Sequence, residues 1–345
     1  MGNKILEKLL NNKRLNETEI FEFVSAIDAE ELSEAEIAAF IMGISSREVS
    51  IDEFTFLVLA LKNFSKKINF NVENIVCSCG TGADGASTFN ISTAAAIVAA
   101  SCEKTIVAKH ANCAISGLCG SSNVIQQLGC SLAVSVEDAI SQADAWNITF
   151  LHSPFFNTAI NKINPVRQKL KIRSLFNFMG PLLNPSNLTG QAFGVASVDM
   201  ASKIIEVLKN LNLKRAMVFC GISPLLDEIS TCSETQIYCL NNGIIEEISI
   251  APEEFGIART SIEELKGGDI AQNAEIITNI FECEESTPKT DIVALNAAAL
   301  LWSAGVVYNL EEGVDLAYNL IENKIALKKL NNIKNWKKSD GKIKK

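Results

Sequence analysis

The stretch from Ile75 to Ala100, IVCSCGTGADGASTFNISTAAAIVAA, decides how we expect this chain to fold. It starts with a short apolar run, passes through a glycine-rich turn, and ends in small and apolar residues that follow Ser92 and Thr93. The apolar run predicts a buried strand, and the alanine run after two hydroxyls predicts a buried helix. The stretch therefore predicts a strand–turn–helix unit.

The turn of this unit is suited to binding phosphate. Gly80, Gly82 and Gly85 free the backbone to adopt positive φ, and the following helix N-terminus adds N–H donors. The same glycines match G-x-G-x-x-G, a pattern of dinucleotide-binding folds. In those folds the helix opens at the third glycine, whereas here the residues ASTFN intervene. Thr88 or Ser92 alone could be a helix cap, but a phosphate site explains the whole cluster.

Composition points to an ordinary globular protein. The chain has 345 residues, of which 48% are hydrophobic and 21% charged, with 7 prolines, so it is long enough for two domains. No run reaches the roughly 18 apolar residues of a membrane helix, and Met1 to Arg14 is charged throughout without a signal-peptide core, so we expect a cytoplasmic protein. The 10 cysteines form no C-x-x-C pair, which predicts reduced core thiols.

Charge argues against broad binding of nucleic acid. The net charge is −9, and the last residues, 324–345, are rich in lysine, so the remaining body is more acidic still. We interpret the lysine-rich tail as a solvated terminus, with anion binding as the alternative.

The first part of the chain predicts a small helical domain, residues 1–69. Three capping-box patterns, Asn16–Glu19, Ser33–Glu36 and Ser50–Glu53, each precede apolar residues at helical spacing. So few helices cannot bury all of these apolar residues. We therefore expect a homodimer through this unit.

Residues 70–345 predict a larger α/β domain. Short apolar runs alternate with helical patterns such as 137–146 and 199–211, which predicts a central, mostly parallel sheet. The expected strands are 75–79, 105–110, 130–135, 148–152, 190–197, 215–221 and 235–240.

The segment 153–185 breaks this alternation and is expected to be a helical insertion that joins the N-terminal helices. Asn164 is its possible N-cap, with Pro165 at the first helical position. On such a helix Arg167 would share a face with Lys171, and Lys169 with Arg173. Two cation pairs can form an anion site or a solvated basic face, and spacing alone does not decide.

A second polar loop follows the expected strand 105–110. The strand ends in Lys109 and His110, and backbone and hydroxyl donors in the loop can wrap phosphate oxygens while the lysine supplies charge. The other histidine, His152, closes a strand and could equally be a satisfied core residue. The polar residues of this loop are Asn112, Ser116, Ser121, Ser122 and Asn123.

Two adjacent acids, Asp227 and Glu228, follow the expected strand 215–221. Mg²⁺ prefers one or two carboxylates together with substrate phosphates, so this pair could complete a magnesium–diphosphate site. The alternative to a magnesium site is that the two acids simply lie exposed in a loop.

Together these motifs resemble the anthranilate phosphoribosyltransferase family, which is related in fold to nucleoside phosphorylases. The resemblance spans nearly the full chain and implies an active site at the hinge between a helical and an α/β domain, in a homodimer. It also implies Mg²⁺-dependent transfer of 5-phosphoribose from phosphoribosyl diphosphate to anthranilate, releasing diphosphate, in tryptophan biosynthesis. The matching motifs are GTGADG, TFNISTA, KHANC, GSSN, RQKLKIRSLFNFMGPLLNP and the DE pair.

The resemblance implies a role for each matched residue and requires no side-chain nucleophile. The residues expected to bind phosphoribosyl diphosphate are Gly80, Thr81, Gly82, Asp84, Gly85, Thr88, Asn90, Ser92, Thr93, Lys109 and Ser121. Those expected to bind anthranilate are Gly80, His110, Asn112, His152 and Arg167. The expected ligands of two Mg²⁺ ions are Ser92, Asp227 and Glu228.

The chain also departs from the family pattern. Ala83 and Ala111 replace glycines, Cys113 replaces an arginine, and Asn123 replaces an aspartate. Loss of the arginine removes a fixed positive charge and up to five donors. Two alternatives therefore stay open: a related phosphoribosyltransferase or nucleoside phosphorylase with another acceptor, and a non-catalytic paralogue that binds a nucleotide or nucleic acid.

Overall fold

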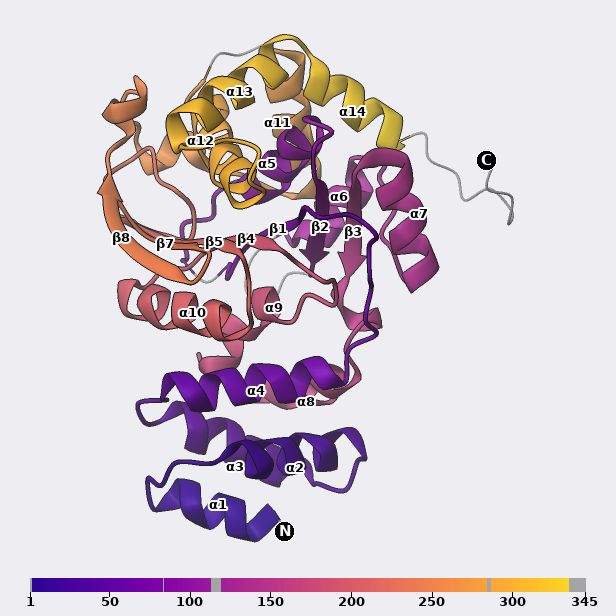
Figure 1. Ribbon diagram of the computed structural model, residues 1–345, viewed down its shortest axis with the longest axis vertical. Helices are drawn as coiled ribbons and strands as arrows, with labels where there is room; N and C mark the ends of the chain where they lie inside the picture. Colours follow the sequence, from indigo (N-terminus) through magenta and orange to yellow (C-terminus); the bar gives the residue numbers. More distant parts are fainter. Residues whose placement is uncertain (1, 83, 113–118, 284–286, 335–345) are drawn as a thin grey trace.

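The computed structural model describes residues 2–82, 84–112, 119–283 and 287–334. Ala83, Cys113 and Ser116, which the sequence singled out, lie outside these ranges. The molecule is elongated, with a helical unit at one end and a layered α/β body at the other (Figure 1). Within the described ranges, no helix is both long and apolar enough to cross a membrane.

Four helices form the N-terminal unit, and three of them begin where the capping boxes predicted. The side chains of Asn16, Ser33 and Ser50 each accept a hydrogen bond from the backbone three residues on, and the glutamate there bonds back. These expected helix starts are confirmed. The helices are α1 (Gly2–Leu10), α2 (Glu17–Asp28), α3 (Glu34–Ser45) and α4 (Ile51–Asn63).

The α/β body is built on one eight-stranded sheet of order β3-β2-β1-β4-β5-β7-β8, with β6 beside β5. The first five strands in this order are parallel, and β6, β7 and β8 are antiparallel to their neighbours. The mostly parallel sheet is therefore confirmed. The strands are β1 (Ile75–Gly80), β2 (Ile106–Ala111), β3 (Ile148–His152), β4 (Gly190–Gly194), β5 (Arg215–Ile222), β6 (Leu225–Leu226), β7 (Thr235–Asn241) and β8 (Ile244–Ile250).

One expected strand, 130–135, is wrong. Only Ala133 forms a bridge to β3, at Leu151. The next helix is capped by Ser135, whose side chain accepts from the Asp138 N–H, so the chain leaves the sheet edge after a single pairing. Strand β8 was not expected, because its glutamates and exposed isoleucines do not form a buried run.

Helices cover both faces of the sheet (Figure 1). On one face α5, α12 and α13 pack together in one apolar core. On the other, α10 packs between β5 and α4, so the N-terminal helices share a core with the sheet. Helices α7 and α10 match the expected crossovers. The helices are α5 (Ile91–Ala100), α6 (Ser121–Gln127), α7 (Val136–Trp146), α9 (Met179–Leu182), α10 (Val198–Asn210), α11 (Ile270–Glu282), α12 (Pro288–Ser303), α13 (Leu310–Glu322) and α14 (Ile325–Lys334).

The inserted helix α8 (Thr158–Leu170) packs against α2 and α3, although it lies more than one hundred residues later in the chain. Its N-cap is Asn157, whose side chain accepts from the Ile160 N–H, so the expected start at Asn164 is wrong. Pro165 lies inside the helix.

The end of α8 also differs from expectation. Lys171 has φ of +53° and terminates the helix in the left-handed region, so Lys171 and Arg173 do not continue its faces. Lys169 pairs instead with Glu34 of α3, at 2.6 Å. The two predicted cation pairs therefore do not form on one helix.

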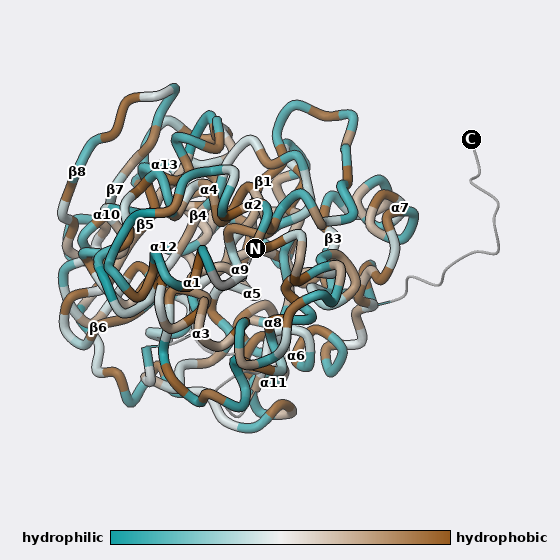
Figure 2. The backbone as a smooth tube through the Cα atoms, turned by 90° about the horizontal axis from the view of Figure 1, so that it is seen from below, coloured by the Kyte–Doolittle hydropathy of each residue, from teal (hydrophilic) through white to brown (hydrophobic). Residues whose placement is uncertain are grey.

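Part of the apolar surface of the helical unit stays uncovered. Phe21, Met42 and Leu59 are each 42% exposed, and Leu10 is 83% exposed. Viewed from this end, brown and teal segments alternate along α1–α4 (Figure 2).

A buried ion pair joins three parts of this unit. Glu53 is only 1% exposed, and its carboxylate accepts from Arg47 Nη1 at 2.9 Å and from the Leu15 N–H at 2.8 Å. The same carboxylate accepts from the Ser50 hydroxyl of its own capping box. One acid therefore holds the start of α4, the loop before α2 and the cation of Arg47.

We expect Glu53→Ala to lower the free energy of unfolding by about 3–5 kcal/mol, because it leaves the buried cation of Arg47 without its carboxylate partner. Urea unfolding followed by circular dichroism measures this. The matched control is Glu48→Ala, whose side chain is 84% exposed and pairs loosely with Lys203; we expect a change of at most about 1 kcal/mol. Equal effects of the two changes would contradict the role of Glu53.

Candidate functional site

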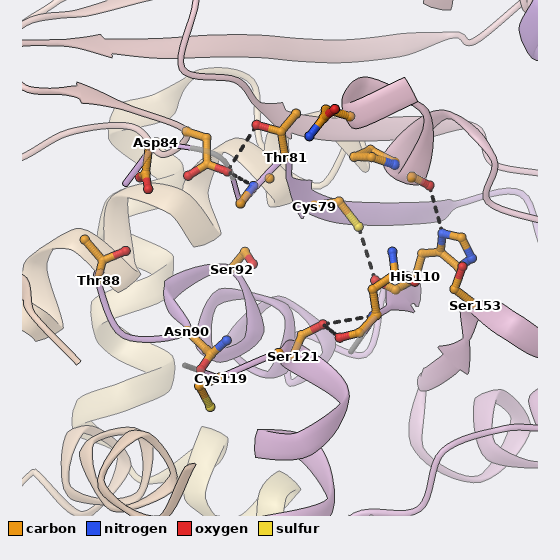
Figure 3. Close-up of a pocket in the computed structure, with 18 of the residues that line it drawn as sticks. Cys79, Thr81, Asp84, Thr88, Asn90, Ser92, His110, Cys119, Ser121 and Ser153 are labelled. Atoms are coloured by element: carbon orange, nitrogen blue, oxygen red, sulfur yellow. Dashed lines mark hydrogen bonds between the residues drawn. The ribbon is translucent and has the colours of Figure 1, made fainter. Parts of the chain in front are cut away.

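A cavity of about 490 Å³ lies at the carboxyl ends of β1 and β2, between the sheet and α8. Ligands of open α/β sheets bind at this edge of the strands. Most of the residues predicted from sequence line it: Gly80, Thr81, Gly82, Asp84, Gly85, Thr88, Asn90, Ser92, Lys109, His110, Asn112, Ser121, Arg167, Asp227 and Glu228. Figure 3 shows Thr88, Asn90 and Ser92 on one side and His110 and Ser153 on the other.

Two predicted residues lie elsewhere. Thr93 is fully buried inside α5 and does not line the cavity. His152 ends β3, and its ring packs against Phe155 with centroids 5.4 Å apart. His152 is half-buried, and its Nδ1 has no hydrogen-bond partner among the described residues, so it is not the satisfied core histidine of the alternative either.

The glycine turn has the backbone that its sequence predicts. Gly82 and Gly85 have φ of +65° and +77°, a region that other residues rarely adopt. Gly80 is required for a different reason, since a Cβ atom there would lie 2.4 Å from Asp227 Oδ2. The Gly82 N–H donates to the same oxygen at 2.5 Å. The turn is therefore held against the acidic loop.

The acids of that loop are buried, so the alternative of exposed loop acids is excluded. Asp227 is 6% exposed and Glu228 is 8% exposed. Burial raises the pKa of Asp227 to about 8, and the negative charge of Asp84 adds to this. Burial and Asp227 together raise the pKa of Glu228 well above its usual range, while Lys109 opposes them.

This acidic group fits a hard divalent cation. Asp84 Oδ2 is buried and has no hydrogen-bond partner among the described residues. A cation would relieve the mutual repulsion of three carboxylates, and Mg²⁺ takes few protein ligands because substrate phosphates complete its shell. Among the described residues, no group of three or more His, Cys, Asp or Glu is placed to hold a metal ion, so Asp84, Asp227 and Glu228 do not by themselves form a metal-binding cluster.

Lys109 supplies a cation beneath the glycine turn. It is 1% exposed, and its Nζ donates to the Ser78 carbonyl at 2.8 Å and to Ser92 Oγ at 3.2 Å. Asn90, the N-cap residue of α5, makes no capping bond, and its Oδ1 is buried without a partner among the described residues. Ser92 and Asn90 therefore present polar groups at the start of α5.

His110 forms the opposite wall of the cavity. Its Nδ1 lies 2.9 Å from the Gly180 carbonyl, so this nitrogen carries the proton and donates. Burial lowers the pKa of His110 to about 4, which keeps the ring neutral near pH 7. Asn112 follows on the same strand end and accepts from the Ser121 hydroxyl through its backbone carbonyl, at 3.4 Å.

The helical side of the cavity carries positive charge. Arg167 is half-buried, its Nη1 donates to Asn164 Oδ1 at 3.0 Å, and no carboxylate of the described residues forms an ion pair with it. Burial lowers the pKa of Arg167 from its usual value. Arg173 lines the same cavity, although no shared helix face places it beside Arg167.

Sequence reasoning missed several residues of the cavity. Phe176 and Asn177 lie within the segment RQKLKIRSLFNFMGPLLNP, so its motif could have indicated them. Gly267, Gly268 and Asn273 carry no local motif. They reach the cavity because backbone bonds join Gly267 to Ser87 and Phe89 to Leu265, far apart in sequence.

Comparisons with known proteins agree over nearly the whole chain. Residues 72–327 match the family described as "Glycosyl transferase family, a/b domain", and residues 3–65 match its "helical bundle domain". Anthranilate phosphoribosyltransferase of Acetivibrio thermocellus is 38% identical over 96% of this chain and 95% of its own length. The enzyme of the same name from Clostridium beijerinckii is 40% identical over 79% of this chain and 80% of its own.

Solved structures give the same result for the fold. The crystal structure of anthranilate phosphoribosyltransferase from Thermus thermophilus superposes with a TM-score of 0.89 at 30% identity, covering 96% of this chain and 98% of that one. The Saccharomyces cerevisiae enzyme in complex with phosphoribosyl diphosphate and Mg has a TM-score of 0.86 at 22% identity, covering 96% of each chain. Another structure of the yeast enzyme holds 4-fluoroanthranilate.

The buried His110 predicts a dependence of stability on pH. Its pKa is about 4 when folded and about 6.5 when unfolded. Between these values the unfolded chain binds a proton that the folded chain does not, so the free energy of unfolding falls as pH falls. We expect this residue to account for about 3 kcal/mol of loss between pH 7 and pH 4.

Urea unfolding of the wild type and of His110→Gln at each pH measures this contribution, since other groups titrate in both proteins. The His110→Gln curve should be flatter by that amount. The control His152→Gln removes the half-buried histidine and should change the slope less. Identical slopes for the wild type and His110→Gln would show that folding does not lower the pKa of His110.

Proposed function

The chain belongs to the anthranilate phosphoribosyltransferase family, and we propose that it transfers 5-phosphoribose from phosphoribosyl diphosphate to anthranilate, in tryptophan biosynthesis. One observation carries the proposal for this chain. A single cavity brings together a glycine turn with positive φ, the buried cation Lys109, the buried acids Asp227 and Glu228, and Arg167. This combination suits a diphosphate, a divalent cation and an anionic acceptor.

In this proposal the diphosphate lies against the turn. The backbone from Gly80 to Gly85 offers N–H groups at close range, and Thr81 and Thr88 add hydroxyls. Asn90, Ser92 and Ser121 contact the ribose and its phosphate, and Lys109 supplies positive charge from below. Thr93, which does not line the cavity, supports the start of α5 from within the core.

Asp227 and Glu228, with the Ser92 hydroxyl, would hold Mg²⁺, and we propose two ions. Bound there, the metal neutralises charge that develops on the departing diphosphate. The high pKa values of both acids fit this role, because a cation at the site favours their ionised forms. The raised values describe the carboxylates before the metal binds.

Arg167 is proposed to face the carboxylate of anthranilate. A planar guanidinium matches a carboxylate with two parallel hydrogen bonds, and this one has no other ion-pair partner among the described residues. Gly80, His110 and Asn112 complete that side of the acceptor site, with His152 behind them. The neutral ring of His110 adds no charge beside the reacting amine.

The reaction needs no protein nucleophile. The amine of anthranilate forms a bond to C1 of the ribose while the bond from C1 to the diphosphate oxygen breaks, and the amine loses one proton. The protein holds the two reactants in line and places donors where charge develops on the leaving group. Its contribution is therefore orientation and electrostatic stabilisation.

We divide the chain into a helical domain, residues 1–69 with the insertion 153–185, and an α/β domain, residues 70–345. The cavity has walls from both, so a hinge motion would close it and exclude the water that would hydrolyse the sugar diphosphate.

We further propose a homodimer through the N-terminal helices. The exposed side chains of Phe21, Met42 and Leu59 support it. The nine cysteines of the described ranges form no disulfide, which fits a cytoplasmic location.

One assay tests the proposed reaction. Mixed with phosphoribosyl diphosphate, Mg²⁺ and anthranilate, the protein should consume anthranilate, which loss of its fluorescence measures. The double variant Asp227→Asn, Glu228→Gln should stay folded and lose this activity by at least about 100-fold, because it removes the metal ligands. Wild-type turnover that does not depend on added Mg²⁺, or activity only with another acceptor, would contradict the proposal.

Arg167→Ala tests the acceptor site. A shielded guanidinium–carboxylate pair contributes on the order of 2 kcal/mol, so the KM for anthranilate should rise at least about tenfold. The KM for phosphoribosyl diphosphate should change little. The control Lys169→Ala, two residues away and exposed in an ion pair with Glu34, should leave both values unchanged. If the KM values for both substrates rise equally, Arg167 contacts phosphate or stabilises the fold.

A further inference from the structure

Two cysteines lie under the glycine turn in a geometry that the reaction does not use. Cys77 and Cys79 are alternate residues of β1, so their side chains share one face of the strand. Their sulfur atoms are 3.3 Å apart. Within the described part of the chain, no other two cysteines have their sulfurs in hydrogen-bond contact. The two thiols are therefore held as a pair.

The pair is buried but reachable from the cavity. Cys77 is 0% exposed, whereas Cys79 is 8% exposed and lines the cavity. The Cys79 thiol donates to the His110 carbonyl at 3.4 Å and lies beside the start of the turn (Figure 3). A small neutral molecule that enters the cavity would meet the sulfur of Cys79 first.

The surroundings favour a reactive thiolate. The Lys109 ammonium is bound to the carbonyl of Ser78, the residue between the two cysteines. Burial raises the pKa of Cys77, but the bond with Cys79 and the charge of Lys109 outweigh it and bring that pKa to about 7. The same bond, together with burial, raises the pKa of Cys79 well above its usual range, so the thiolate of the pair is Cys77. The thiolate form is the one that reacts with peroxides and disulfides.

We propose that Cys77 and Cys79 form an oxidation site at which a small hydroperoxide converts the thiol pair to a disulfide and reversibly disables the glycine turn. The peroxide oxygen–oxygen bond breaks as the Cys77 sulfur, 3.3 Å behind that of Cys79, takes one oxygen, giving a sulfenic acid and an alcohol or water. The Cys79 sulfur then attacks the Cys77 sulfur, and water leaves. Two thiols and one hydroperoxide give one disulfide, one alcohol or water, and one water, with two electrons passing to the peroxide.

The bond alters the site because β1 must bend before it can close. A strand rises about 3.3 Å per residue, which puts alternate Cα atoms about 6.6 Å apart, near the upper limit of disulfides at about 6.8 Å. On one face of a straight strand the Cβ atoms are about equally far apart, beyond the roughly 4.5 Å that a disulfide allows. Closing the pair therefore pulls on β1 and draws the Cys79 sulfur away from the His110 carbonyl. Gly80 follows Cys79 directly, so the turn moves with it. A shift of about 1 Å at a positioning group can cost about 100-fold in rate.

Peptide mapping tests the oxidation itself. The protein is treated with hydrogen peroxide, denatured, alkylated with N-ethylmaleimide, digested and analysed by mass spectrometry. The peptide with Cys77 and Cys79 should lack two hydrogen atoms and take up no alkyl group, and dithiothreitol should reverse both changes. A peptide that still takes up two alkyl groups would overturn the proposal. This readout does not depend on the proposed function.

An activity assay tests the effect of oxidation on the glycine turn, and this part of the inference rests on the proposed function. Peroxide should lower kcat/KM for phosphoribosyl diphosphate at least ~10-fold, and dithiothreitol should restore it. In Cys77→Ala, compared with its own untreated sample, the dithiothreitol-reversible loss should vanish because the sulfur that attacks the peroxide is absent. Cys119→Ala removes another cysteine of the cavity wall and should still show the reversible loss of activity.

The two outcomes separate the two proposals. A reversible loss that persists in Cys77→Ala would assign the oxidation to another cysteine and overturn the inference. If mapping finds the disulfide but neither the oxidised nor the reduced protein turns over anthranilate, the proposed function fails and the oxidation site stands.

Discussion

The close contact between Asp227 and two glycines is the constraint on which the cavity depends. A Cβ atom at Gly194 would lie 1.7 Å from the Asp227 carbonyl oxygen, and one at Gly80 would lie 2.4 Å from its carboxylate. The acidic loop therefore rests directly on the ends of β1 and β4, which pair through Gly80 and Gly194 themselves. Because both supports lack side chains, the carboxylate reaches the Gly82 N–H and fixes the glycine turn.

Around that contact, the fold brings together residues that are far apart in the chain. The sheet supplies the turn, Lys109 and the acids, and α8 supplies Arg167 from the opposite side. Helix α8 is held by α2 and α3, and Asn157 ties its start to the end of α4 by donating to the Leu61 carbonyl at 2.7 Å. The N-terminal helices therefore help to position Arg167, although this residue belongs to α8.

Much of this could be predicted from local sequence, for a physical reason. The capping boxes and the buried runs of the parallel strands carry their signal within a few residues, so these elements were placed correctly. Glu53 shows the limit of such signals: its capping role was predicted, but its bonds to Arg47 and Leu15 depend on tertiary packing. The start of α8 was misplaced because Pro165 resembles a first helical residue, while Asn157 provides the actual cap.

The same distinction between local signals and tertiary packing applies to the residues of the cavity. Its motif residues were named in advance, whereas Gly267 and Asn273 were missed because long-range backbone pairing brings them there. Thr93 and His152 do not line the cavity, although they stand beside motif residues, because Thr93 is buried in the core and His152 packs against Phe155. Sequence neighbours of a binding residue point in different directions, to opposite faces along a strand and about 100° apart around a helix, so adjacency predicts contact poorly.

The two sides of the cavity also differ in how freely they can change over evolutionary time. On the side where the acidic loop meets the strand ends, Gly80 and Gly194 leave no room for a methyl group, so few substitutions at these two positions preserve the site. The side that carries Arg167 belongs largely to one continuous stretch, 153–183. Duplicated copies of such a gene can therefore acquire new acceptors by altering one segment, while the machinery that activates the sugar is inherited unchanged.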